Sequence, residues 1–194
     1  ELLRRYVSLL SNKAFLGNTL VLSTMTACFF AWVAAAPALF AFRYGISPAR
    51  FGTIMLVISM GFVIGTFVAA RAARFIPMER MMAYGAWCIA ASMVLLISAA
   101  WIDNPYYYVG VMLTYSISNG FVYPTSITGA TAVDPRIAGA ASAFMGFIQL
   151  IVGTVASALA GGFAGASPVS LIGVCLVCGL LTPVSLFLIP RSRD

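Results

Sequence analysis

The chain has 194 residues, of which 62% are hydrophobic and 8% are charged, and it contains no His. Soluble proteins are roughly 45–50% apolar and about 25% charged, so the composition excludes a soluble globular protein. The formal net charge of +6 does not indicate a nucleic-acid partner, because the cations lie at the ends of hydrophobic runs. We therefore predict an integral membrane protein whose surroundings are the lipid bilayer.

Six apolar stretches follow one another along the chain, at about 17–42, 51–70, 81–101, 106–130, 138–164 and 169–189. Each has about the length of one helical bilayer crossing. Prolines separate the stretches and close the last one: Pro48, Pro77, Pro105, Pro135, Pro168 and Pro190. Because Pro is best tolerated at helix ends, we predict an all-α bundle of six transmembrane helices over 17–190. A cytoplasmic interfacial segment over 1–16 precedes the bundle, and a cytoplasmic tail over 191–194 follows it.

The cations are distributed unequally between the two sides of the predicted bundle. Only Arg43 and Arg50 lie on one side, whereas the other holds Arg4, Arg5, Lys13, Arg71, Arg74, Arg80, Arg136, Arg191 and Arg193. The positive-inside rule then places both termini in the cytoplasm of a multi-pass protein of the inner (plasma) membrane. The chain begins with Glu1 and shows no cleavable signal, so we expect a piece of a longer polypeptide.

No Asp, Glu, Lys or Arg lies well inside a predicted span. Proton-coupled transporters usually need an intramembrane acid, so we expect any such group outside this segment. Without His or an intramembrane acid there is no plausible general base, which argues against an enzyme. Cys175 and Cys178 form a C-x-x-C without a His or a second pair nearby, so we expect no metal and no cofactor.

Neutral polar residues gather in the fourth predicted span. Helical spacing places Tyr115, Asn119, Val122 and Ser126 on one face, with Tyr123 at its edge. A membrane-buried Asn must be hydrogen-bonded, either to a neighbouring helix or to water and ligand in a cavity. Both interpretations of Asn119 remain open, and the aromatic neighbours offer a surface for hydrophobic or cationic guests.

Small residues recur every three or four positions in the fifth span: Gly139, Ser142, Gly146, Gln149, Gly153, Ser157 and Gly161. Such a stripe predicts close packing against another helix, with Gln149 either packed or facing a cavity. Gly61 and Gly65 form a G-x-x-x-G in the second span, for which packing is also expected.

Pro37 and Pro124 occupy corresponding places in the first and fourth spans. Because three crossings change sides, two copies of a three-helix unit would have opposite orientations, and matching interruptions of this kind are typical of secondary transporters. We therefore predict a 3+3 inverted repeat in which Pro37 and Pro124 act as conformational hinges.

The chain resembles the C-terminal six-helix half of a major facilitator superfamily transporter. The resemblance rests on AGAASAFMGFIQLIVGTVASALAG over 138–161, on the G-x-x-x-P from Gly120 to Pro124 and on YGISPARFG over 44–52. Within the superfamily, these segments resemble drug:proton antiporters of the bicyclomycin-resistance and chloramphenicol-efflux type. The resemblance implies a twelve-helix fold whose N-terminal six-helix half is missing here, and proton-coupled efflux of small amphiphilic molecules by alternating access.

The resemblance also implies which residues form the site. The first and fourth helices of each half line the central cavity, so the candidates for substrate binding are Phe29, Trp32, Tyr115, Asn119 and Tyr123, to which we add Gln149. The superfamily's loop motif G-x-x-x-D-R-x-G-R-R is only partly present in GTFVAARAAR, which keeps Gly65 and Arg74 and has Arg71 one position after the motif's first Arg. Ala69 replaces its acid, so the charge-relay role of that acid cannot be assigned. Arg71, Arg74 and Arg80 are the candidates for a cytoplasmic gate.

Two alternatives remain open at this point. A transporter of a specific metabolite, such as a sugar or an organic acid, would share the fold. An oligomeric membrane channel or a scaffold could also consist of six helices, although the short loops offer no filter-like segment or charged ring.

Overall fold

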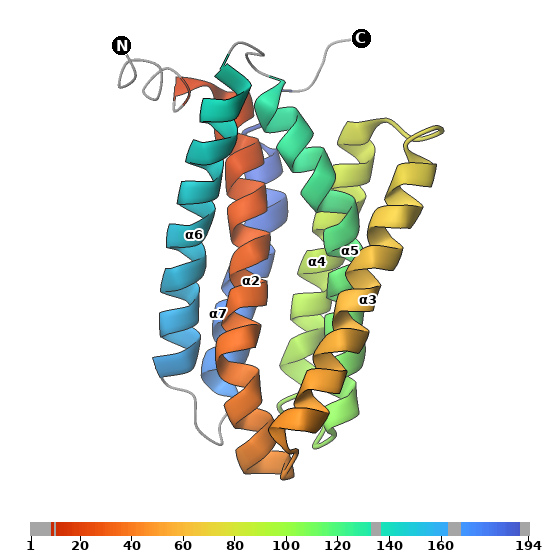
Figure 1. The fold of residues 1–194 in the computed structure, drawn as a ribbon, viewed down its shortest axis with the longest axis vertical. Helices are drawn as coiled ribbons and strands as arrows, with labels where there is room; N and C mark the ends of the chain where they lie inside the picture. Colours follow the sequence, from red (N-terminus) through yellow and green to blue (C-terminus); the bar gives the residue numbers. More distant parts are fainter. Residues whose placement is uncertain (1–8, 10, 133–136, 163–167, 191–194) are drawn as a thin grey trace.

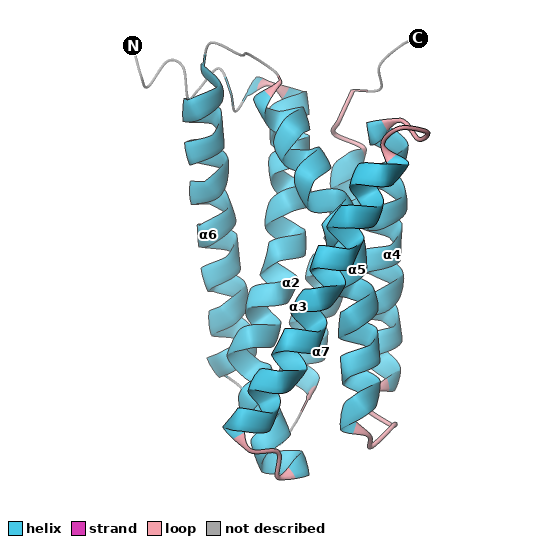
Figure 2. Ribbon diagram, turned by 45° about the vertical axis from the view of Figure 1, so that its right-hand side comes forward, coloured by secondary structure: helices cyan, strands magenta, loops and turns pink. Residues whose placement is uncertain are grey.

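The computed structural model describes residues 9, 11–132, 137–162 and 168–190. These residues form six long helices and no strand: α2 (Lys13–Tyr44), α3 (Pro48–Ala72), α4 (Met78–Ser98), α5 (Pro105–Thr131), α6 (Ala138–Gly162) and α7 (Val169–Leu186). The helices run roughly side by side (Figure 2). The predicted all-α, six-helix bundle is confirmed, and its helix ends lie within a few residues of those expected from the apolar stretches.

Local capping groups explain where the helices begin. The Asn12 side chain accepts hydrogen bonds from the first-turn N–H groups of α2, and Asn104 does the same for the backbone N–H of Tyr106 in α5, at 2.9 Å. Pro48 and Pro105 occupy the first turns of α3 and α5, where a missing N–H costs no helical hydrogen bond. α2 ends at Gly45, whose φ of 62° is the left-handed conformation that glycine adopts without strain.

Five of the six described helices are long and apolar enough to cross a membrane, and α5 is the exception. α5 is the helix that carries Tyr115, Ser116, Ser118 and Asn119. It packs against α2, α3 and α4, so many of its side chains contact other helices instead of lipid. A central position removes the need for a uniformly apolar surface, which explains the lower hydropathy of α5.

The helix contacts repeat between the two halves of the chain. α2 packs against α6 and α7, and α5 packs in the same way against α3 and α4, while the pairs α2–α5 and α4–α7 join these two groups of helices. Exchanging α2, α3 and α4 for α5, α6 and α7 therefore reproduces the pattern of contacts. Figure 1 shows the consequence: α2 lies with α6 and α7, and α5 lies with α3 and α4. This arrangement agrees with the predicted 3+3 repeat.

The two rows of small residues that were predicted to pack against other helices, in α3 and in α6, differ in the structure. Gly61 and Gly65 lie against α5, and a Cβ added at Gly65 would meet the backbone of Ile117, so the expected packing of the G-x-x-x-G is observed. The stripe in α6 is only partly packed. Gly153 lies against the Phe30 ring and Gly161 near Ala34, whereas nothing surrounds Gly139 or Gly146.

The expectation that the whole α6 stripe packs against one helix is therefore wrong. Its packed face is instead formed by a neighbouring row of mostly Ala and Met side chains: Ala141, Met145, Gly153, Ala156 and Ala160. Ala offers nearly as close an approach as Gly, and the larger Met side chain fills the wider gap beside it.

The two terminal segments lie largely outside the described residues. These segments include residues 1–8 and 10 of the predicted interfacial segment and the whole predicted tail over 191–194. α2 begins at Lys13, four residues before the predicted start of the bundle. The interfacial role of 1–16 stays a prediction.

Candidate substrate cavity

A cavity of about 520 Å³ lies between α2, α3, α5 and α6. Its wall combines four aromatic rings with small hydroxyl and amide groups and contains no charged side chain. The lining residues are Thr26, Phe29, Phe30, Ser59, Phe62, Val63, Ser116, Asn119, Tyr123, Gln149 and Leu150. Its volume is in the range of small-molecule binding pockets, which are mostly apolar with a few placed polar groups.

Four of the six predicted substrate-binding residues meet at this cavity: Phe29, Asn119, Tyr123 and Gln149. They come from α2, α5 and α6, so residues far apart in the sequence share one wall. The Tyr123 ring packs edge-on against Phe62 of α3, with 5.9 Å between the ring centroids. The aromatic part of the wall therefore has a fixed geometry in which an apolar guest can stack.

Asn119 is held by a chain of hydrogen bonds that runs from α5 to α2. Its Nδ2 donates to the Tyr115 hydroxyl at 3.3 Å, and the Tyr115 hydroxyl donates to the backbone carbonyl of Met25 at 2.5 Å. The Asn119 Oδ1 is buried and has no hydrogen-bond partner. Asn119 thus bonds within α5 and reaches α2 only through Tyr115, while its side chain lines the cavity; its role in substrate binding stays a prediction.

Gln149 likewise both packs and lines the cavity. Its Nε2 donates to the Thr26 hydroxyl at 2.8 Å, which joins α6 to α2 across the cavity wall. Thr26 is itself 8% exposed, so this bond is sheltered from water. A buried polar link of this kind fixes the position of the amide beside the aromatic rings.

Trp32 and Tyr115 do not line the cavity, although both were predicted to do so. Both side chains are fully buried. Trp32 donates from Nε1 to the Met55 sulfur at 3.4 Å and packs edge-on against Phe40, with 5.7 Å between the ring centroids. Tyr115 points to α2, where its hydroxyl reaches the Met25 carbonyl. Residues on a lining helix can face its neighbours instead of the cavity, and these two do.

The residues that α3 contributes were missed by the sequence analysis. Ser59, Phe62 and Val63 line the cavity beside the predicted residues, as do Phe30 and Ser116 from α2 and α5. The resemblance assigns the cavity lining to the first and fourth helices only, so residues of α3 were not considered as candidates. Ser59 carried a usable signal, because it is a hydroxyl in an otherwise apolar stretch of α3.

The two predicted hinge prolines lie inside uninterrupted helices. Pro37 is exposed in α2, and Pro124 is half-buried in α5 one residue after the cavity-lining Tyr123. Each leaves one backbone carbonyl of its helix without the usual N–H partner, which permits a bend. Their role as hinges stays a prediction.

The three predicted gate arginines lie near the α3–α4 connection. Arg71 is in the last turn of α3, Arg74 follows that helix, and Arg80 is in the first turn of α4; all three are exposed. The ion pair recorded among the described residues lies elsewhere, between Arg43 Nε and Asp103 Oδ1 at 2.9 Å. The gate role of Arg71, Arg74 and Arg80 stays a prediction.

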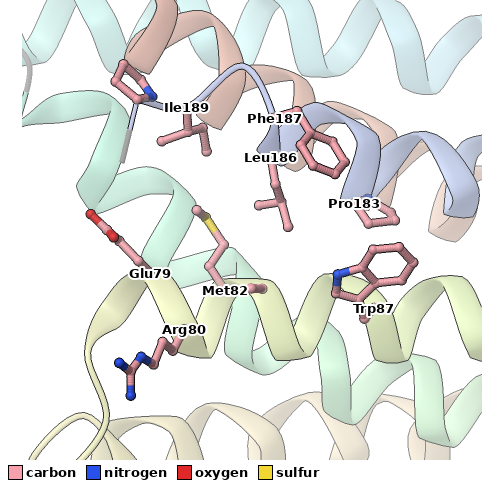
Figure 3. Close-up of a pocket in the computed structure, with 10 residues that line it drawn as sticks. Glu79, Arg80, Met82, Trp87, Pro183, Leu186, Phe187 and Ile189 are labelled. Atoms are coloured by element: carbon pink, nitrogen blue, oxygen red, sulfur yellow. The ribbon is translucent and has the colours of Figure 1, made fainter. Parts of the chain in front are cut away.

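A second pocket of about 880 Å³ lies between α4 and the end of α7. Figure 3 shows Met82 and Trp87 of α4 facing Leu186 and Phe187, with Glu79 and Arg80 toward one end. Both hollows open to the apolar surface, since Trp87 is 58% exposed here and Leu150 is 58% exposed in the first. Arg80 is the one predicted site residue that the second pocket contains. The cavity between α2, α3, α5 and α6 is thus the better candidate for substrate.

Comparisons with known proteins support a transporter. A segment of 155 residues is 25% identical to the uncharacterized MFS-type transporter YdgK of Bacillus subtilis (strain 168), covering 79% of this chain and 39% of the relative. Over 156 residues, the chain is 24% identical to the multidrug transporter MdfA of Edwardsiella piscicida, covering 77% of the chain and 37% of that protein. MdfA of Edwardsiella tarda (strain FL6-60) shows the same values. No family model matches the chain.

The resemblance to major facilitator superfamily transporters is thereby confirmed. The chain spans less than two fifths of the length of the curated relatives it matches, which agrees with one half of a twelve-helix fold. Together with the apolar helices, the similarity identifies a multi-pass membrane protein.

Proposed function

We propose that this chain is the C-terminal half of a secondary active transporter that exports drugs or other small amphiphilic molecules in exchange for protons. The observation that carries the proposal is the neutral, aromatic cavity between α2, α3, α5 and α6. Amphiphilic molecules with little charge gain from aromatic contact and apolar burial without needing a counter-ion in the wall. A specific organic anion would instead need a cation there.

Alternating access requires a second bundle opposite this cavity. We propose that an N-terminal six-helix half supplies that wall together with the acid that carries the proton, since the described spans hold no acid in their interior. Rocking of one bundle against the other would then expose the cavity to each side in turn. By the positive-inside rule, we propose that the end with Arg71, Arg74 and Arg80 lies on the cytoplasmic side of the inner (plasma) membrane.

Replacing Asn119 or Gln149 by Leu in the complete transporter tests the substrate site. Leu keeps the approximate volume and removes the amide, so we expect a changed substrate profile with expression intact. Growth of the variants should be measured against a panel of amphiphilic toxic compounds, beside their protein level in the membrane. Cys88→Ser serves as a matched control, because Cys88 is exposed on α4 and lies outside the lining residues. Loss of folding without a change of profile would show that the amides only hold helices together.

The need for a second half is tested in liposomes. Reconstituted alone, the 194 residues should not catalyse uptake of a fluorescent amphiphile, whereas the polypeptide with both halves should. Robust uptake by the isolated chain contradicts the proposal and favours a self-contained channel or carrier.

A further inference from the structure

We infer that the cavity selects molecules that donate a hydrogen bond, because Tyr115 orients the Asn119 amide by accepting one of its N–H groups, which leaves the amide oxygen without a partner. This inference rests on the proposed function, since it names the substrate class of the same cavity. It concerns one property of the substrate, the N–H or O–H group that it carries beside its apolar body.

The orientation of the Asn119 amide follows from the direction of the hydrogen bonds around Tyr115. The Met25 carbonyl can only accept, so the Tyr115 hydroxyl must use its single proton for that bond. The phenol oxygen can then only accept from Asn119, and it is the amide nitrogen that lies 3.3 Å away. A flipped amide would set two acceptors against each other. Nδ2 thus uses one of its two N–H groups on Tyr115, and Oδ1 is the amide atom that has no partner.

A second lining group is restricted in the same way. The Ser116 hydroxyl donates its proton to the Ile58 carbonyl at 2.6 Å, which leaves its oxygen lone pairs as the group's remaining capacity. Ser116 and Asn119 lie one turn apart on α5, on the side that faces the cavity. Both groups therefore present an acceptor oxygen to this part of the wall.

The unpartnered Oδ1 also provides a reason for binding. A buried acceptor without a partner is unfavourable, and a donor from a ligand would satisfy it. Oδ1 is closed off from solvent in this conformation, so a ligand reaches it only when neighbouring side chains of the wall move aside. The hydrogen bond gained then favours the rearranged wall.

These features define a substrate class: flat aromatic molecules with an amino or hydroxyl N–H or O–H, neutral or cationic. The cationic acridine dyes proflavine and acridine orange form a suitable pair of probes. Proflavine has two free amino groups, and acridine orange carries the same ring system with both amino groups dimethylated. The pair differs in amino N–H donors and, through four methyl groups, in apolar area. Variants must therefore be judged by their effect on the ratio of affinities for the two dyes.

The test compares Tyr115→Phe with Tyr108→Phe in the complete transporter. Tyr108 is equally buried, and its hydroxyl donates to the Ala99 carbonyl at 3.1 Å, away from the cavity. Both variants lose one buried phenol hydroxyl, but only Tyr115→Phe frees the Asn119 amide to rotate. Dye binding is measured by fluorescence anisotropy on purified protein, and dye transport is measured in liposomes.

The wild type should bind proflavine in preference to acridine orange, and Tyr115→Phe should reduce that preference about fivefold while Tyr108→Phe leaves it unchanged. Asn119→Leu should reduce it as well, which provides a second variant should Tyr115→Phe fail to fold. An unchanged preference in a folded Tyr115→Phe or Asn119→Leu variant overturns the inference. Selective binding without transport of either dye contradicts the proposed function and leaves the donor selectivity in place.

Discussion

The crossings α3–α5 and α6–α2 occupy equivalent places in the repeated helix contacts, yet they are built differently. At α3–α5, Gly65 meets Gly120 so closely that a Cβ on Gly120 would lie 2.5 Å from the Thr66 backbone nitrogen. At α6–α2, Gly153 meets the ring of Phe30, and Gln149 binds Thr26. One crossing is backbone against backbone, and the other is backbone against side chain.

The cavity lies between these two crossings, and both of them line it. Two facing glycines bring the backbones of α3 and α5 together, whereas a Phe ring and a Gln–Thr hydrogen bond lie between α6 and α2. Phe30, Thr26 and Gln149 therefore serve two purposes, because they hold α6 against α2 and also line the cavity.

The largest expected effect is that of Gly120→Ala. The added Cβ would meet the backbone of α3, which cannot move aside as a side chain can. We expect a loss of about 1–3 kcal/mol or more, seen as poor expression and a lower melting temperature in detergent. Gly146→Ala is the matched control, because nothing lies within 4 Å of its added Cβ. Equal stability of the two variants would show that the α3–α5 crossing is not close-packed.

Gly153→Ala should have a smaller effect on the same melting temperature. Its Cβ would meet the Phe30 ring, which can rotate or shift within the cavity wall. We expect a loss below that of Gly120→Ala, together with a change in dye affinity because Phe30 moves. A loss of stability as large as that of Gly120→Ala would show that the two crossings are equally close-packed, contrary to this expectation.

Thr26→Val should change stability by only about 0.6 kcal/mol, the average of membrane interhelical hydrogen bonds. Val keeps the shape of Thr and removes the acceptor of the Gln149 bond. The freed Gln149 amide should change the affinity for dye clearly and the melting temperature only slightly. Thermal unfolding and dye binding, both measured on one preparation, distinguish the two effects. Thr53→Val is the control, because Thr53 is exposed and its hydroxyl bonds within its own helix.

Asp103→Asn should have the smallest effect. It removes the charge from the exposed pair with Arg43, whose two side chains are 29% and 69% exposed. Exposed pairs contribute about 0–1 kcal/mol, and salt weakens them further. A melting temperature that falls as far as in Gly120→Ala would show that this exposed ion pair contributes as much to stability as the close-packed α3–α5 crossing.

The sequence by itself determined the number of helices and nearly all their ends. Long apolar runs separated by prolines and capped by Asn12, Ser47 and Asn104 are local features, and local geometry fixes where a helix starts and stops. The sequence also identified Asn119 and Gln149 as the notable amides, because polar groups in apolar spans need partners.

The tertiary structure alone decided which way each helix faces. Lipid tails are as apolar as Leu, so in a membrane a packed face and a lipid-facing face have similar side chains, and periodicity does not tell them apart. For this reason the packed row of α6 was misassigned, and Trp32 and Tyr115 were expected in the cavity although they lie in the core. The orientation of the Asn119 amide depends on the Met25 carbonyl of another helix, and only the packing of α2 against α5 brings the two together.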